Sequence, residues 1–171
     1  MSAQDWLSVT AKALGKDPAR FDDEHFRYRA YLDELQGGSS ERADEILRLV
    51  KDDPDPVMAD SVVVQGIERG AAESHSVDGF EAWIARNQHV LERFPFARNR
   101  ANEWLTVLKL EDGGEVPESA DMSDWLQRTL SERSERVAVI QALAESGRTR
   151  RIRARAQERL RDMTRDRQSG S

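Results

Sequence analysis

Apolar residues recur at intervals of three and four along almost the whole chain, and short polar breaks separate the periodic segments. This spacing places apolar side chains on one face of an α-helix, whereas a half-buried strand would show strict alternation, which we do not find. The pattern predicts an all-α protein of eight or nine helices. We expect stacked antiparallel helix pairs, in either a helical solenoid or a compact bundle.

Breaks and capping signals set the expected helix boundaries. Ser2 with Asp5, and Asp78 with Glu81, have the spacing of a capping box. Asp55 precedes a proline at the first helical position, which also marks a helix start. The expected helices cover residues 3–13, about 19–36, 40–50, 56 to about 69, about 78–91, about 95–108, 121–145 and about 149–163. The segment 121–145 fits one long helix or two that break near residues 131–134.

The length of 171 residues suits one compact domain. Apolar residues make up 38% of the chain, enough to build a core, so global disorder is not expected. We expect a single helical domain over residues 1–165. The polar end, residues 166–171, is expected to form a flexible tail.

Three tryptophans, Trp83, Trp104 and Trp125, follow one another at intervals of 21 residues. A helix of about 15 residues with a short loop has this length, so a helix pair would repeat after about 42 residues, within the range of HEAT repeats. Equal spacing also arises by chance. Because Leu or Ile accompanies each tryptophan at helical spacing, we expect these rings to anchor the core and not to stack on a ligand.

Two segments, at about residues 41–70 and 134–161, share an apolar helix, a tight polar break and a second helix with regularly spaced apolar residues. The first break, residues 53–57, reads Asp-Pro-Asp-Pro-Val and is followed by Ala59. The later second helix carries Ile-Arg at residues 152–153, then Ala156 and Leu160.

These two segments resemble HEAT helical repeats, which often contain an Asp-Pro turn and a second helix that opens with Val-Arg. The chain departs from that pattern at Met58, where an arginine is usual, and at residues 146–148, where Ser-Gly-Arg replaces the Asp-Pro turn. The resemblance implies a curved stack of helix pairs that offers a concave surface to a protein partner.

The sequence contains no recognisable catalytic motif. It has no cysteine, which excludes disulfides, Cys-ligated metals and thiol nucleophiles. Neither a nucleophile elbow nor a phosphate-binding glycine loop occurs. Asp22 and His25 have the spacing of a carboxylate–histidine metal site, but no matching second pair accompanies them. We expect a protein that is not an enzyme and has no metal and no cofactor.

The chain also lacks the sequence signals of membrane proteins. No apolar stretch is long enough to span a bilayer, and residues 1–5 have neither the basic nor the apolar region of a signal peptide. We therefore expect a cytoplasmic location and no membrane partner.

Charge is distributed unevenly along a chain whose net charge is −6. From Arg148 onward nine arginines accompany three acidic residues, a balance of +6, so the preceding residues carry −12. Guanidinium groups bind carboxylates and phosphates alike. Three roles therefore stay open for this cluster: pairing with acids of the same chain, binding an acidic protein, or binding RNA or DNA. The arginine cluster comprises Arg148, Arg150, Arg151, Arg153 and Arg155.

The acidic body favours a protein partner with a basic surface, because complementary charge raises association rate and selectivity. The candidate contact residues are Asp22, Asp23 and Glu24, together with the arginine cluster. We expect a non-catalytic binding scaffold or adaptor, and an immunity-type inhibitor of a basic toxin is one hypothesis of this kind. The alternative is a nucleic-acid-associated protein that binds through the arginine-rich last helix, although that helix lacks aromatic residues for base stacking.

Overall fold

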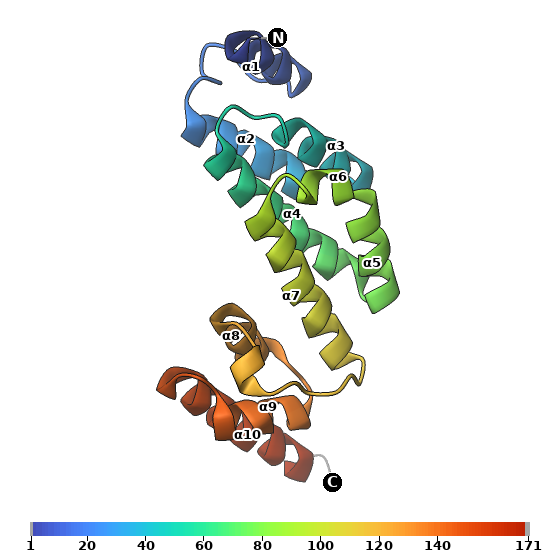
Figure 1. The fold of residues 1–171 in the computed structure, drawn as a ribbon, viewed down its shortest axis with the longest axis vertical. Coiled ribbons are helices and arrows are strands. Elements are labelled where there is room, and N and C mark those ends of the chain that lie inside the picture. The colour runs from blue at the N-terminus through green and yellow to red at the C-terminus, as the bar shows by residue number, and fades with distance from the viewer. Residues whose placement is uncertain (1, 170–171) are drawn as a thin grey trace. The chain divides into compact units, whose positions relative to one another are not determined.

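The computed structural model describes the backbone of residues 2–169 and the side chains of residues 2–165. Within this part of the chain there are ten α-helices and one short 3₁₀-helix, and no strand (Figure 1). The predicted all-α class is confirmed. The count exceeds the prediction because Asn87 divides the helix expected over residues 78–91 into α5 and the four-residue α6.

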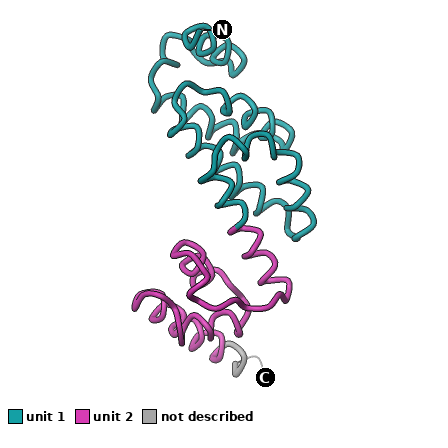
Figure 2. The backbone as a smooth tube through the Cα atoms, viewed as in Figure 1, with its two compact units in different colours: residues 1–102 teal, residues 103–171 magenta. Residues whose placement is uncertain are grey.

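The structure divides into two compact units, residues 1–102 (unit 1) and residues 103–171 (unit 2), shown in Figure 2. Helix α7 (Pro95–Glu111) begins in unit 1 and ends in unit 2. The division describes packing and not independent folding, so the single domain expected over residues 1–165 stays a prediction. The expected tail, residues 166–171, lies outside the residues whose side chains are described.

Unit 1 is organised around α4, which packs against α2, α3 and α5. Val62, Val63 and Ile67 are fully buried on this helix, so the β-branched segment belongs to a helix, as its flanking spacing predicted. Besides the start of α7, the helices of unit 1 are α1 (Ala3–Ala13), α2 (Glu24–Gly37), α3 (Ser40–Val50), α4 (Pro56–Ser74), α5 (Val77–Arg86) and α6 (Gln88–Leu91).

Two of the predicted helix starts are confirmed in atomic detail. Ser2 and Asp5 form a reciprocal capping box at the start of α1. Asp55 accepts the two leading N–H groups of α4, at 3.1 and 3.0 Å, and Pro56 occupies the first helical position. Each cap satisfies backbone donors that a helix leaves without an internal partner.

Two other predicted starts are wrong. The helix expected near residue 19 begins at Glu24, because Asp23 is the side chain that caps it. The helix expected at Asp78 begins at residue 77, because the Ser76 hydroxyl accepts the N–H of Gly79 at 3.1 Å. Asp78 instead lies in the first turn, where a negative charge is favourable.

Helix α4 continues five residues beyond the expected end at residue 69. Gly70 is buried there beneath Trp83 of α5, and a Cβ at this glycine would lie 2.6 Å from the indole ring. The ring in turn stacks on Phe80, with centroids 5.6 Å apart. Close packing against α5 thus holds the last turns of α4 in helical form, which local sequence signals do not show.

Unit 2 holds the end of α7, the 3₁₀-helix η1 (Ser119–Asp121), α8 (Asp124–Arg133), α9 (Val137–Ser146) and α10 (Arg150–Ser169). Residues 121–145, left open by the sequence, therefore contain two helices, which the buried Ser134 and its neighbours separate. Helix α10 packs mainly against α9 and also against α8. Leu130, Ile140 and Leu143 are fully buried in this packing.

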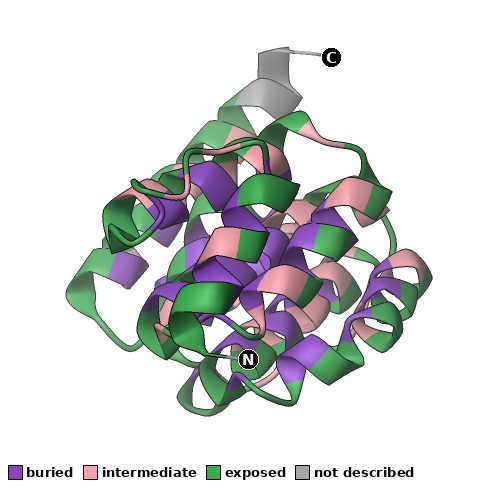
Figure 3. Ribbon diagram, turned by 90° about the horizontal axis from the view of Figure 1, so that it is seen from above, coloured by how far each residue is buried: buried purple, intermediate pink, exposed green. Residues whose placement is uncertain are grey.

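The described helices show the expected two-sided pattern, with buried and exposed positions alternating along each one (Figure 3). The tryptophans were expected to anchor the core: Trp83 and Trp104 are buried, and the half-buried Trp125 contacts Trp104 edge to face at 5.5 Å. Their equal spacing does not give equivalent positions. They are the seventh residue of α5, the tenth of α7 and the second of α8.

Candidate functional site

Each unit has a surface hollow whose lining includes several charged side chains. The one in unit 1 lies at the N-termini of α2 and α4 and has a volume of about 520 Å³. We call it the acid-edged hollow. It is lined by Glu24, His25, Tyr28, Arg29, Asp55, Val57, Met58 and Ser61.

A buried ion pair holds both N-termini of this hollow in place. Arg27 of α2 donates from Nε to Asp53 Oδ2 at 3.2 Å, and the two side chains are 5% and 0% exposed. Its Nη1 group donates to the carbonyl oxygens of Phe21 and Asp22, both at 2.9 Å. Arg27 thereby fixes the segment that leads into α2.

The Asp53 carboxylate fixes the turn that leads into α4. Its Oδ1 atom accepts the backbone N–H of Asp55 at 2.9 Å, and its Oδ2 atom accepts the Tyr31 hydroxyl, also at 2.9 Å. Burial, followed by the neighbouring Asp53 carboxylate, raises the pKa of Tyr31, so this phenol stays a donor. Since every oxygen of the buried carboxylate has partners, the desolvation cost of the ion pair is offset locally.

The three acidic residues expected to contact a partner, Asp22, Asp23 and Glu24, are all exposed and directly precede or open α2. The structure brings Glu24 together with Asp55, which are far apart in the sequence, on one hollow. Backbone N–H groups of Phe26 and then His25 lower the pKa of Asp23, so its carboxylate stays ionised.

The hollow combines these carboxylates with an exposed apolar side chain. Val57 is 77% exposed, the most exposed large hydrophobic residue of the described chain. The Glu24 and Asp55 carboxylates outnumber the one lining arginine, Arg29, so the charges around the apolar Val57 can attract a partner that carries basic groups.

The geometry at His25 differs from a metal site. Its Nδ1 atom lies 3.5 Å from the Glu24 carboxylate, on an exposed surface. Among the described residues, no group of three or more His, Asp or Glu side chains is placed to hold a metal ion.

The arginine cluster of the last helix separates into residues that hold the fold together and residues that do not. Arg148 donates to the carbonyl oxygen of Met122 at 3.0 Å and pairs with Asp124 at 3.1 Å. Arg153 donates to the carbonyl of Gly147 at 2.6 Å, at the end of α9. These donors satisfy carbonyl groups near helix ends, a structural role.

Gln127 and Arg159 are further donors of this kind in unit 2. The fully buried Gln127 side chain donates to the carbonyl of Ser119 at 2.7 Å and accepts the N–H of Arg148 at 2.8 Å. Arg159 donates to the carbonyl groups of Glu132, in the last turn of α8, and of Ser134, just after that helix. The loops of unit 2 are thus held by side chains that donate to the backbone.

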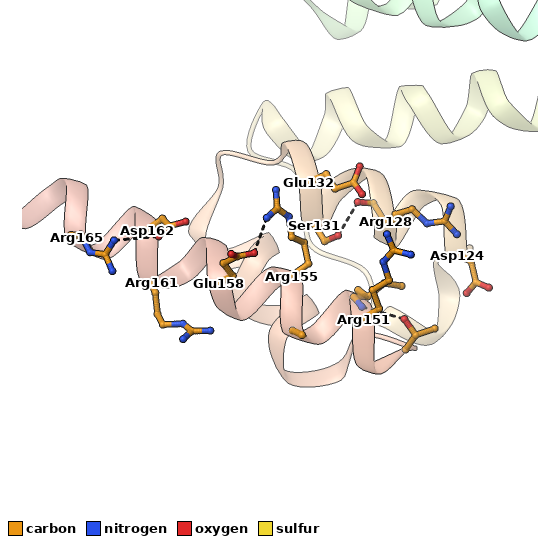
Figure 4. A pocket seen from close by; sticks show the side chains of 13 residues that line it. Asp124, Arg128, Ser131, Glu132, Arg151, Arg155, Glu158, Arg161, Asp162 and Arg165 are labelled. Atoms are coloured by element: carbon orange, nitrogen blue, oxygen red, sulfur yellow. Dashed lines mark hydrogen bonds and ion pairs between the residues drawn. The ribbon is translucent and has the colours of Figure 1, made fainter.

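Several other arginines border a larger hollow between α8 and α10, which we call the arginine groove (Figure 4). Its volume is about 1170 Å³. Arg151 and Arg155 of the predicted cluster line it, whereas Arg150 is exposed outside its lining. The charged lining residues are Arg128, Arg151, Arg155, Arg161, Arg165, Asp124, Glu132, Glu158 and Asp162.

Net charge differs between the units in a way that the linear sequence obscures. Unit 1 contains 13 basic and 19 acidic side chains, whereas unit 2 contains 13 of each. The entire net charge of −6 therefore belongs to unit 1.

Sequence reasoning missed three residues that matter here. The sequence indicates Asp53 only as part of a turn, it gives no signal for Gln127, and Arg128 lies outside the arginine-rich segment. Only Asp53 had a local signal, its place in the Asp-Pro-Asp-Pro turn. The other two gain their roles from contacts with residues about 20 or more positions away.

Comparison with protein-family models finds no match for the chain, and neither does comparison with curated proteins or with solved structures. The resemblance to HEAT repeats therefore stays a prediction. Within residues 2–169, no helix has both the length and the apolar character needed to cross a bilayer.

Proposed function

We propose that this chain is a non-catalytic protein-binding scaffold that holds a basic partner at the acid-edged hollow of unit 1. The observation that carries the proposal is the exposed Val57 side chain within a hollow bordered by the Glu24 and Asp55 carboxylates. Buried apolar contact would supply affinity, and the carboxylates would select a basic surface.

The net charge of unit 1 and the fixed position of its helix N-termini support the same proposal. Unit 1 carries the whole net negative charge, which attracts basic proteins over a distance set by ionic strength. The Arg27–Asp53 pair holds both helix N-termini before any partner arrives, and preorganisation lowers the entropy cost of binding. An adaptor and an immunity-type inhibitor of a basic toxin are two forms that such a scaffold can take.

The proposal is tested by capture from the native host lysate, with and without nuclease, using three baits. The first is the unmodified chain. The second carries Asp22→Asn, Glu24→Gln and Asp55→Asn, changes that remove three charges and keep an N-cap at residue 55 because asparagine also caps helices.

The third bait carries Asp33→Asn, Asp78→Asn and Glu92→Gln, three exposed acidic positions of unit 1 that do not line the hollow. We expect a basic protein that survives nuclease and is retained by the first and third baits. Its retention by the second bait should fall at least about tenfold, equivalent to about 1.4 kcal/mol. Equal retention by all three baits would remove the hollow as the binding site.

A further inference from the structure

Two arginines in the arginine groove have no partner within the described part of the chain. Arg128 of α8 and Arg151 of α10 both line the groove, and their side chains extend toward the same end of it (Figure 4). Neither side chain forms a hydrogen bond or an ion pair with any described residue. Two neighbouring positive charges without a counter-charge favour an incoming anion.

Most of the nearby carboxylates are already engaged. Asp124 pairs with Arg148 at 3.1 Å, Glu158 with Arg155 at 2.7 Å, and Asp162 with Arg165 at 3.7 Å. Glu132 is the lining carboxylate that has no ion pair among the described residues. The end of the groove at Arg128 and Arg151 therefore keeps an excess of positive charge, whereas the rest is close to balanced.

Packing does not explain these two arginines. Other arginines of this segment, Arg148, Arg153 and Arg159, stabilise unit 2 by donating to backbone carbonyls. Arg128 and Arg151 are exposed and take no part in that network. Their removal is thus not expected to unfold unit 2, and they remain available to another molecule.

The lining favours a protein segment over a nucleic acid. Glu132, Glu158 and Asp162 line the groove, so a continuous chain of phosphates along it would lie next to three carboxylates. None of the described lining residues is aromatic and able to stack on bases, whereas the exposed Ala154 supplies apolar surface. A segment with carboxylates at one end and basic groups further along matches this order of charges.

The length of the groove limits the segment. Arg151 and Arg165 lie at its two ends on one helix, 14 residues apart in the sequence, or about 21 Å along the axis. A partner helix of about 14 residues would lie along this distance.

We infer that the arginine groove binds a helical segment of a second protein that is acidic at one end, where its carboxylates are held by Arg128 and Arg151. Guanidinium groups donate two parallel hydrogen bonds to a carboxylate, so two of them at one end of a groove set both position and direction. This site is separate from the acid-edged hollow of unit 1. If the proposed function also holds, the chain joins two different proteins.

The test is fluorescence anisotropy with a labelled helical peptide of about 15 residues, with Glu at one end, Ala and Leu in the middle and Lys at the other. A second peptide has Gln in place of each Glu, and the third probe is a labelled oligothymidylate of similar length. The groove variant is Arg128→Gln with Arg151→Gln. The matched control is Arg93→Gln with Arg150→Gln, two exposed arginines outside the lining.

We expect the Glu peptide to bind the unmodified chain and the control equally, and the groove variant about ten- to a hundredfold more weakly. The Gln peptide should bind no better to the unmodified chain than to the groove variant. Circular dichroism confirms that both variants keep their helices, so that loss of binding is not loss of folding.

Three outcomes would overturn the inference: no binding of the Glu peptide, equal weakening in the control, or equal binding of the Glu and Gln peptides. Tighter, groove-dependent binding of oligothymidylate would assign the site to nucleic acid instead. The variant with Asp22→Asn, Glu24→Gln and Asp55→Asn should bind the Glu peptide normally, so failure of this inference is distinguishable from failure of the proposed function.

Discussion

Different side chains hold the irregular segments of the two units: buried carboxylates act beside Arg27 in unit 1, and mainly side-chain donors act in unit 2. In unit 1 buried carboxylates accept: Asp53 binds Arg27, and Asp44 of α3 accepts the Asn87 amide at 3.0 Å. In unit 2 the connections are made by donors, as Gln127 and Arg136 reach backbone carbonyl groups in the loops between helices. Unit 1, where buried carboxylates hold the irregular segments, carries the net negative charge, whereas unit 2, where side-chain donors hold them, has no net charge.

In both units, many charged residues are engaged within the fold, so counting charged residues does not locate a binding surface. Asp44 and Asp53 add to the acidity of unit 1 but are buried and engaged. Arg148 and Arg153 add to the basic last segment but donate to carbonyls. A charge that is satisfied within the fold has little left to offer a partner, because binding would require breaking its internal hydrogen bonds.

The largest effect is expected in unit 1, from Asp53→Ala. This change leaves the buried Arg27 without a counter-charge and removes the acceptor of the Tyr31 hydroxyl. We expect the free energy of unfolding to fall by about 3–5 kcal/mol, measured by urea denaturation and circular dichroism. The adjacent, exposed Asp52→Ala is the control and should change it by no more than about 0.5 kcal/mol. Similar losses in both variants would contradict the anchoring role.

The matching change in unit 2 is Gln127→Leu. It leaves the buried carbonyl of Ser119 and the N–H of Arg148 without this partner, at an expected cost of about 2–3 kcal/mol. Hydrogen exchange should rise in residues 115–150 first. Gln141→Leu, at an exposed position of α9, serves as control. If the exchange increase appeared mainly in unit 1, the assignment of Gln127 to the loops of unit 2 would be wrong.

Arg159→Ala tests a single donor of unit 2. The change frees the carbonyl groups of Glu132 in the last turn of α8 and of Ser134 just after it, and we expect a loss of about 1–2 kcal/mol by thermal or urea unfolding. Arg161→Ala, whose side chain donates only to the Gln157 carbonyl of its own helix, should have a smaller effect. Equal losses would contradict a stabilising role for the hydrogen bonds from Arg159 to the end of α8.

The smallest effect concerns Asp60 of α4, which accepts the N–H of Ala97 at 3.2 Å. Burial raises the pKa of Asp60 above its ordinary value of 3.8, against the opposing effect of that hydrogen bond. The folded state then holds its proton to higher pH than the unfolded chain, so this group destabilises the fold as pH rises through its raised pKa.

Asp60→Asn keeps the acceptor and removes the charge. Relative to the unmodified chain, its free energy of unfolding should increase as the pH is raised above 3.8 and then level off. The gain should be about 0.5 kcal/mol, because Asp60 is half-buried and solvent screens its charge. A stability difference that is constant with pH would rule out Asp60 as the titrating group.

Local signals predicted the helices well where capping and periodicity coincide. The starts at Ser2 and Pro56 are correct because each depends on side chains within three residues. The errors at residues 19 and 78 arose where two acceptors, such as Ser76 and Asp78, compete for one helix start. The extension of α4 past residue 69 depends on Trp83, which a local pattern cannot include.

Some of the predicted contact residues line the two hollows: Glu24 lines the first, and Arg151 and Arg155 line the second. Asp22 and Asp23 are exposed next to Glu24 but do not line the hollow, and contact of any of these residues with a partner stays a prediction. Arg148 and Arg153 belong to the fold, a distinction that composition cannot make because an arginine-rich helix presents its side chains in all directions.

Apolar periodicity and the absence of strand alternation determined by themselves that this protein is helical, since a helix forms its backbone hydrogen bonds within one segment. Tertiary structure alone decided which charged side chains are paired within the fold and which remain exposed at the surface. The Arg27–Asp53 pair joins residues 26 apart in the sequence. Arg128 and Arg151 line the same groove only because α8 packs on α10. A hydrogen bond between distant residues depends on the packing of whole helices, which residue spacing along one helix does not specify.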